Sequence, residues 1–185
     1  MFKTYFEYIF ELIKVVLVSL VIIIPIRYFL IQPFYVKGAS MEPSFFDHEY
    51  LIIDEISYRF EKPIRGDTVV FRYPRNPQEY FIKRIIGLPG EKIQIRDGHV
   101  YIFNSEGEDG FLLEEDYLSE GIKTFSLTED VIELGEGQYY VLGDNRTSSK
   151  DSRSFGAVDE SFIVGRVMLR GWPLDRAKLF RTLEY

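Results

Sequence analysis

The sequence predicts a mainly β fold: an antiparallel-sheet domain preceded by one N-terminal transmembrane helix. Three observations predict it. The segment from Val15 to Ile26 carries no charge, and short apolar runs bounded by Gly, Pro or Asp follow it. Aromatic residues make up 16% of the chain, and such residues are enriched in strands. The 185 residues suit one globular domain with a short appendage.

The N-terminal segment favours a membrane-spanning helix over residues 12–31, after a short tail over residues 1–11. With Lys14 and Arg27 reaching outward near its ends, this segment has the roughly 20 residues that cross a bilayer. A cleavable signal peptide is the alternative, because the uncharged core is short. No Ala-x-Ala site follows the core, which favours an uncleaved anchor. Basic residues flank the core on both sides, so charge leaves its orientation open.

From residue 32 to residue 185 the pattern indicates one domain of strands and turns. Asp97-Gly98 lies between two apolar runs and is a hairpin signal. Residues 104–137 hold eleven acidic residues and one lysine, and we expect an acidic insert there with little regular structure. The other apolar runs predict short strands at 50–53, 68–71, 80–86, 93–95, 100–103, 138–142 and 164–169.

Composition excludes several classes of function. The net charge is −7, and no basic stripe with interleaved aromatic residues points to nucleic acid as a partner. The chain has no cysteine, which excludes disulfides, a thiol nucleophile and a Cys-based metal site. His48 and His99 are the two histidines, and no carboxylate pattern around them resembles a zinc site. We therefore expect no metal and no cofactor, and a base other than histidine.

Lys83 is the most informative residue of the β domain. Alternation along a strand places it beside Phe81 and Ile85, and lysine is rarely buried unless it is paired or functional. One interpretation is an edge strand on which Lys83 and Arg84 both reach water along their stems. The other is that burial disfavours the ammonium and lowers the pKa of Lys83 toward the range of a general base. Such a lysine could take the proton of a serine hydroxyl.

Four motifs follow one another after the N-terminal segment. They are Gly38-Ala-Ser40-Met-Glu-Pro, Gly66-Asp-Thr-Val-Val-Phe71, Lys83-Arg84, and Gly143-Asp-Asn-Arg-Thr-Ser-Ser-Lys-Asp-Ser-Arg153. Each motif alone is common, but the four in this order resemble type I (bacterial leader) signal peptidase, a family of serine proteases with a Ser/Lys dyad. The resemblance runs from the anchor to about Gly165. It implies a membrane-bound serine endopeptidase whose antiparallel β catalytic domain lies outside the cytoplasm.

The resemblance assigns roles to individual residues. Ser40 would be the nucleophile, Lys83 its general base, and Ser149 the serine that orients the lysine. Acyl transfer would proceed in two steps through an ester on Ser40. Four more residues match positions that brace this site structurally: Arg84, Asp144, Asp151 and Arg153.

The oxyanion hole is where this chain departs from the family. The backbone N–H of Ser40 would supply one donor. Many relatives add a side-chain hydroxyl two residues before the nucleophile, where this chain has Gly38. Loss of one such donor costs about 3 kcal/mol in other serine proteases, so the second donor is a question for the structure.

The resemblance also implies partners and a location. The substrates would be preproteins that carry N-terminal signal peptides, cut at the membrane after small residues at Ala-x-Ala type sites. The enzyme would be a single-pass protein of the plasma membrane, embedded in the lipid bilayer. Its N-terminus would be cytoplasmic and its catalytic domain extracytoplasmic.

Two other functions stay open at this point. A membrane-anchored β domain could bind exported chains without cutting them, which fits the acidic insert and Gly38 but leaves Lys83 unexplained. A Ser/Lys autopeptidase of the transcription-repressor kind shares the dyad. Such proteins carry a DNA-binding domain, and nothing in this sequence resembles one.

Overall fold

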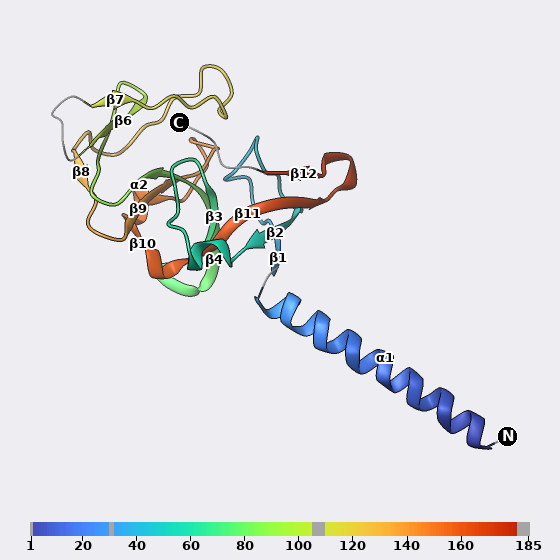
Figure 1. Cartoon of the computed structure of the whole chain (residues 1–185). Coiled ribbons are helices and arrows are strands. Elements are labelled where there is room, and N and C mark those ends of the chain that lie inside the picture. The colour runs from blue at the N-terminus through green and yellow to red at the C-terminus, as the bar shows by residue number, and fades with distance from the viewer. Residues whose placement is uncertain (1, 30–31, 105–109, 181–185) are drawn as a thin grey trace.

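Strands form where β-branched and aromatic residues alternate with polar ones, as the sequence predicts. The computed structural model describes residues 2–29, 32–104 and 110–180, and it confirms a mainly antiparallel β body with an N-terminal helix (Figure 1). The helices are α1 (Phe2–Phe29) and α2 (Ser152–Phe155). The strands are β1 (Gln32–Tyr35), β2 (Tyr50–Asp54), β3 (Thr68–Tyr73), β4 (Asn76–Gly87), β5 (Lys92–Arg96), β6 (His99–Phe103), β7 (Phe111–Leu112), β8 (Ile132–Glu133), β9 (Gln138–Leu142), β10 (Val158–Asp159), β11 (Ile163–Trp172) and β12 (Lys178–Leu179).

The larger sheet has the strand order β1-β2-β11-β3-β4-β9-β10, with β12 beside β11. All of its pairings are antiparallel. Because side chains alternate along β3, Val70 joins an apolar cluster with Met41 and Leu51, whereas Val69 and Phe71 join a different cluster. The larger sheet is therefore packed on both faces, which holds its central strands β3 and β4 rigidly.

The smaller sheet has the order β7-β6-β5-β8 and is built around the predicted hairpin. Asp97 and Gly98 both have positive φ, at 55° and 86°, as a two-residue hairpin turn requires. The inward side chains of β5 and β6 form one cluster with Ile86 of β4 and Tyr140 of β9. This shared cluster fixes the smaller sheet against the end of β4.

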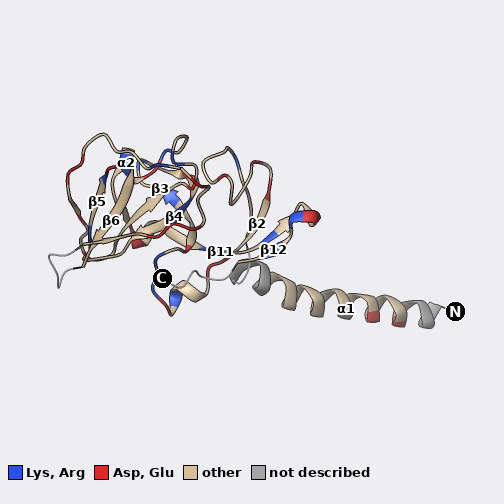
Figure 2. Cartoon of the chain, turned by 90° about the horizontal axis from the view of Figure 1, so that it is seen from above, with Lys and Arg blue, Asp and Glu red and all other residues tan. Residues whose placement is uncertain are grey.

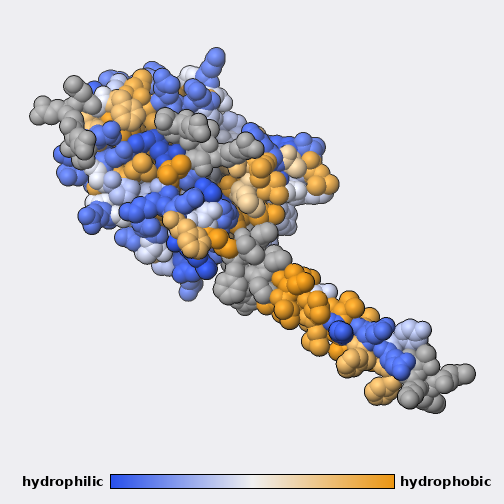
Figure 3. Space-filling view, viewed as in Figure 1, coloured by the Kyte–Doolittle hydropathy of each residue, from blue (hydrophilic) through white to orange (hydrophobic). Residues whose placement is uncertain are grey.

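Helix α1 projects away from the β body, and its surface is mostly apolar (Figure 1, Figure 3). Figure 2 shows acidic residues near its N-terminal end. Among the described residues, no helix combines the length and the apolarity needed to span a membrane. The described side chains of α1, residues 6–24, include the charged Glu7, Glu11 and Lys14. The transmembrane helix expected over residues 12–31 is thus not confirmed, and residues 30 and 31 lie outside the described part of the chain.

The acidic insert expected over residues 104–137 is more integrated than the sequence indicates. It contributes β7 and β8 to the smaller sheet, and Leu113 and Leu134 are buried in the core of that sheet. Thr124, farther along the insert, is 1% exposed. Residues 105–109 lie outside the described part. The insert is therefore packed on the β body through both apolar and polar side chains.

Candidate active site

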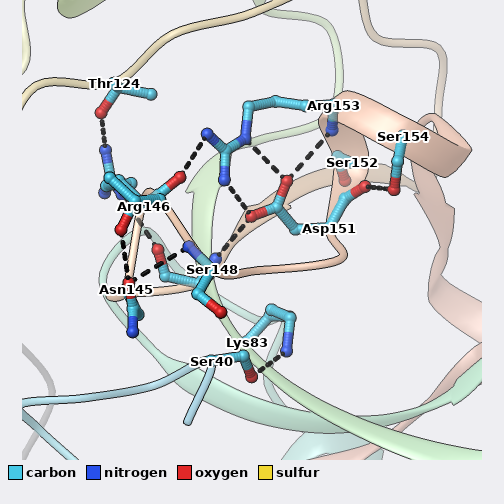
Figure 4. Close-up of polar contacts among 12 residues, drawn as sticks. Ser40, Lys83, Thr124, Asn145, Arg146, Ser148, Asp151, Ser152, Arg153 and Ser154 are labelled. Carbon is cyan, nitrogen blue, oxygen red and sulfur yellow. Dashed lines mark hydrogen bonds and ion pairs between the residues drawn. The ribbon is translucent and has the colours of Figure 1, made fainter.

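The first and third motifs meet at one point of the larger sheet (Figure 4). Ser40 lies in the turn that follows β1, and Lys83 lies on β4 opposite Val69 of β3. The Lys83 Nζ donates a hydrogen bond to Ser40 Oγ at 2.7 Å and a second one to the carbonyl oxygen of Ile82 at 2.6 Å. The two residues for which the sequence predicts the chemistry are thus in direct contact.

Burial makes Lys83 a suitable base. The residue is 3% exposed, and burial lowers the pKa of its side chain to about 8, against the opposing effect of the Asp151 and Asp144 carboxylates. Arg84 is only 6% exposed, so the interpretation in which both cations reach water is wrong. A lysine with a pKa of about 8 is half neutral at about pH 8. Its lone pair then faces the Ser40 hydroxyl and can accept the hydroxyl proton.

Arg84 points to the opposite face of β4 and binds Asp144. Its Nε donates to Asp144 Oδ1 at 2.9 Å and its Nη2 to Asp144 Oδ2 at 2.6 Å, a bidentate and buried ion pair. The Nη1 group donates to the carbonyl oxygen of Gly66 at 2.8 Å. The guanidinium also lies over the ring of Tyr117, 4.1 Å from its centroid. This pair joins β4 to the start of the fourth motif.

Asp151 and Arg153 hold the other end of the fourth motif together. Asp151 is the N-cap of α2, and its carboxylate accepts hydrogen bonds from Arg153 Nε and Nη2 at 2.8 Å and 2.7 Å. It also accepts the backbone N–H of Gly143 at 3.0 Å. Burial opposes ionisation of Asp151, but the hydrogen bonds and charge of Arg153 outweigh it, and the pKa of Asp151 is lowered. Asp151 therefore stays charged and closes the loop from residue 143 to residue 153.

Ser149 lies beside Ser40 and Lys83. Among the described residues, no hydrogen bond joins Ser149 to Lys83. Its Oγ is buried and near enough to the Asp151 carboxylate to favour the charged form, but it makes no hydrogen bond of normal geometry. Gly143 packs between the two serines, since a Cβ there would overlap both Ser149 Oγ and the carbonyl oxygen of Ser40. The structure thus brings Ser149 next to Ser40, and its predicted role in orienting the lysine stays a prediction.

Replacing Gly143 with Ala is expected to lower kcat at least about 100-fold, because Cβ must displace the backbone of Ser40, and a misplacement of about 1 Å can have that effect. Peptide cleavage by the purified variant measures this. The matched control is Gly171→Ala, where the nearest atom to the added Cβ is 4.0 Å away and activity should be retained. Equal activity of both variants would contradict the tight approach at Gly143.

Gly38 supplies no side-chain donor to an oxyanion hole, and its backbone explains why glycine suits the position. Its φ is +88°, a left-handed conformation that glycine adopts without strain. Its N–H donates to Asp47 Oδ1 at 2.9 Å. His48 pairs with the same carboxylate and is exposed, as a solvated loop residue should be. Among the described residues the backbone N–H of Ser40 has no hydrogen-bond acceptor, so it can serve as a donor.

Sequence reasoning missed several residues that shape this site. Asn145 contacts the backbone of the nucleophile turn, with its N–H on the Ser40 carbonyl oxygen at 3.1 Å and its Nδ2 on that of Ala39 at 3.1 Å. Arg146 is buried and pairs with Glu115 of the acidic insert. The motif contains Asn145 and Arg146, but nothing in the sequence marks Glu115, which is 31 residues away.

A cleft of about 540 Å³ opens directly at the dyad. Ser40 and Lys83 lie in its wall. The rest of the wall includes residues 34–37, at the end of β1 and just beyond it, and residues 79–82 of β4. A larger cavity of about 690 Å³ lies around Arg84 and Arg170, and neither Ser40 nor Lys83 lines it. Because the chemistry is at the dyad, the smaller cleft is the candidate substrate site.

The chain is similar to proteins of one known family. Residues 9–172 match the model of the family described as signal peptidase, peptidase S26. The probable signal peptidase I-2 of Synechocystis sp. is 36% identical over 174 residues, which cover 91% of this chain and 76% of that protein. Signal peptidase IB of Staphylococcus aureus is 33% identical over 177 residues, covering 91% and 92%. The crystal structure of a signal peptidase I from Enterococcus faecalis V583 is 36% identical, with a TM-score of 0.47, covering 57% of this chain and 97% of that one.

Together these findings define the class of protein: the chain is an enzyme, a hydrolase that cuts peptide bonds. It belongs to the signal peptidase family, peptidase S26, and its relatives include type I signal peptidases. The resemblance drawn from the four motifs is therefore confirmed.

Proposed function

We propose that this peptidase removes N-terminal signal peptides from exported preproteins, with Ser40 as the nucleophile and Lys83 as the general base. One observation carries the proposal: a buried lysine with a lowered pKa donates a 2.7 Å hydrogen bond to a serine hydroxyl in the wall of a cleft. The names of the relatives, signal peptidase I-2 and signal peptidase IB, support the choice of substrate.

The reaction is acyl transfer to Ser40 followed by hydrolysis. Neutral Lys83 accepts the Ser40 proton as Oγ adds to the scissile carbonyl carbon, and the N–H of Ser40 donates to the resulting oxyanion. The ammonium of Lys83 then protonates the leaving amine, which releases one product and leaves an ester on Ser40. The neutral lysine next takes a proton from water as its oxygen adds to the ester carbonyl carbon. When the intermediate collapses, the Lys83 ammonium returns the proton to the Ser40 oxygen, which frees the acid product and restores both residues.

The cleft suits an extended peptide. Residues 34–37 and 79–82 form two of its walls. Among the pairings of the described residues, β1 pairs with β2 alone and β4 pairs with β9 only from Arg84 onward, which leaves one edge of each segment unpaired. Their backbone groups can pair with a peptide as in strand addition. Apolar side chains that include Val36, Leu51 and Ile82 face the cleft, which favours small uncharged side chains beside the cut. We therefore expect cleavage after small residues at Ala-x-Ala type sites.

We also place the enzyme in the plasma membrane, as a single-pass protein with a cytoplasmic N-terminus. Large apolar side chains along α1 are exposed, Leu17 by 57% and Val21 by 72%, and they pack on no part of the described β body. Such a surface favours contact with lipid. The location would bring Ser40 near membrane-inserted preproteins, the proposed substrates.

The proposal predicts a pH dependence. Because the general base must be neutral, kcat/KM of the full chain in detergent should rise with pH through the pKa of Lys83, about 8, and then level off. The substrate is a precursor with an Ala-x-Ala site, and mass spectrometry locates the cut. A precursor with Trp before the cut should resist cleavage, and Ser40→Ala should be inactive. Activity that persists in Ser40→Ala would refute the nucleophile. Binding of precursors without any cleavage would favour the non-cutting binding domain.

A further inference from the structure

Asn145 is tied to the turn that carries the nucleophile. Its side-chain Nδ2 donates to the carbonyl oxygen of Ala39 at 3.1 Å, and its backbone N–H donates to that of Ser40 at 3.1 Å. The side-chain oxygen accepts from Thr147 Oγ1 at 3.1 Å and from the N–H of Ser148 at 3.2 Å. These two donors fix the orientation of the amide, so that its NH₂ group must face Ala39. Figure 4 shows this loop passing directly beside Ser40 and Lys83.

The bond to Ala39 has a consequence for the oxyanion donor. The Ala39 carbonyl and the Ser40 N–H belong to one planar trans peptide unit, in which C=O and N–H point in opposite directions. A group that holds the carbonyl oxygen therefore sets the direction of the N–H. Within the described residues that N–H has no acceptor of its own, so its direction depends on what holds the Ala39 carbonyl oxygen. The N–H of Glu42 also donates to the Ala39 oxygen, at 3.2 Å, and bounds the same peptide from inside the turn.

We propose that Asn145 is a positioning residue that aims the Ser40 N–H at the oxyanion of the tetrahedral intermediate. The inference rests on the proposed function, since it needs Ser40 as the nucleophile. It also bears on the departure at Gly38, which offers no side-chain hydroxyl. Where one donor must serve, its direction decides how much it stabilises the transition state.

The test is Asn145→Ala, which removes the NH₂ donor and adds no charge near Lys83. Removal of one oxyanion donor lowers kcat about 100- to 1,000-fold, and a misdirected donor should lose about 10- to 100-fold. We expect kcat to fall by that factor with KM changed less than about 3-fold, because the interaction is stronger in the transition state. The affinity for a peptide aldehyde ending in Ala should fall in parallel, since its adduct with serine carries the same oxygen.

Three readouts separate positioning from a structural defect. The acid limb of the pH profile should stay near the pKa of Lys83, about 8, and the melting temperature should change little. Asn145→Ser serves as a second variant if Asn145→Ala does not fold. Asn104→Ala, at an exposed position that follows β6, is the matched control and should keep wild-type kcat.

Two outcomes would overturn the inference. The first is an unchanged kcat in both Asn145 variants. The second is a fall in kcat that is matched by a shifted acid limb, by a raised KM or by a lost melting transition. A wild-type enzyme that neither cuts the precursor nor binds the aldehyde would instead refute the proposed function itself, and the inference with it.

Discussion

Replacing Lys83 with Met is expected to lower kcat by roughly 10,000-fold or more, as loss of the base does in serine proteases, and also to stabilise the fold at pH 7. Met has a similar length and suits a buried site. The folded protein holds Lys83 with a pKa of about 8, against 10.5 for the ordinary value. Each pKa unit corresponds to about 1.4 kcal/mol, so burying the ammonium destabilises the fold by roughly 3 kcal/mol. The lost bonds to Ser40 and Ile82 offset part of the gain.

The pH dependence of this effect has a definite sign. The unfolded chain binds the lysine proton more tightly than the folded chain, so between pH 8 and 10.5 the unfolded state carries more protons. Stability of the wild type therefore rises with pH through this window, and the advantage of Lys83→Met shrinks. Urea unfolding of the full chain in detergent, followed by the fluorescence of the single Trp172, measures both proteins at several pH values.

The matched control is Lys62→Met, which removes an exposed lysine. We expect this variant to retain activity and to have a free energy of unfolding close to that of the wild type. A Lys83→Met protein that is less stable than the wild type at pH 7 would show that the buried ammonium is compensated in the folded state. It would also remove the physical basis for a general base at this position.

The predicted strands are correct where apolar and polar residues alternate along the sequence. Leu51 and Ile53 alternate with half-exposed or exposed residues along β2, and Ile93 and Ile95 do the same along β5. The short strands β1, β10 and β12 were not predicted. Each has at most four residues, and pairing with a longer partner defines it. Two or four residues are too few for a pattern to mark a strand.

The residues of the candidate active site also fall into those that the sequence predicted and those that it did not. Ser40 and Lys83 were predicted because each lies in a motif and Lys83 disturbs the apolar pattern of its own strand. Glu115 was not predicted, because its partner Arg146 lies on another segment of the chain. A single carboxylate in an acidic stretch also has no pattern that distinguishes it. Asn145 was not predicted, because its function lies in the backbone atoms that it contacts. Contacts between segments that are distant in the sequence can be identified only once the fold is known.

The acidic insert supports the loop from residue 143 to residue 153. Glu115 binds Arg146 through two hydrogen bonds, and Thr124 accepts a third from the same guanidinium. Farther along, the carbonyl oxygen of Phe125 accepts from Arg153 Nη1 at 3.1 Å. Figure 4 shows Arg146 and Arg153 on two sides of the loop above the dyad. An insert that holds both arginines also holds the loop that positions Ser149 and contacts Ser40.

Asp144→Asn is expected to destabilise the protein by about 3 kcal/mol or more, because it leaves the Arg84 guanidinium buried without its counter-charge. The effect on catalysis is separate. The Asp144 carboxylate raises the pKa of Lys83 against the dominant effect of burial, so its neutralisation should lower that pKa further. The acid limb of the pH profile should then move to lower pH. Urea unfolding and kcat/KM against pH measure the two effects independently.

A double variant distinguishes the effect of leaving one buried charge unpaired from the effect of losing the ion pair as a whole. When both partners of a buried pair are replaced by apolar residues, no unpaired charge remains, and the loss is often small or reversed. We therefore expect Arg84→Met combined with Asp144→Leu to be more stable than Asp144→Asn alone. Recovery should be incomplete, because Arg84 also binds the Gly66 carbonyl oxygen and packs on Tyr117. Asp130→Asn, at an exposed site of the insert, should match the wild type. The single variants Arg84→Met and Asp144→Leu complete the cycle, and a double variant whose loss equals the sum of their losses would mean that the pair adds no coupling energy.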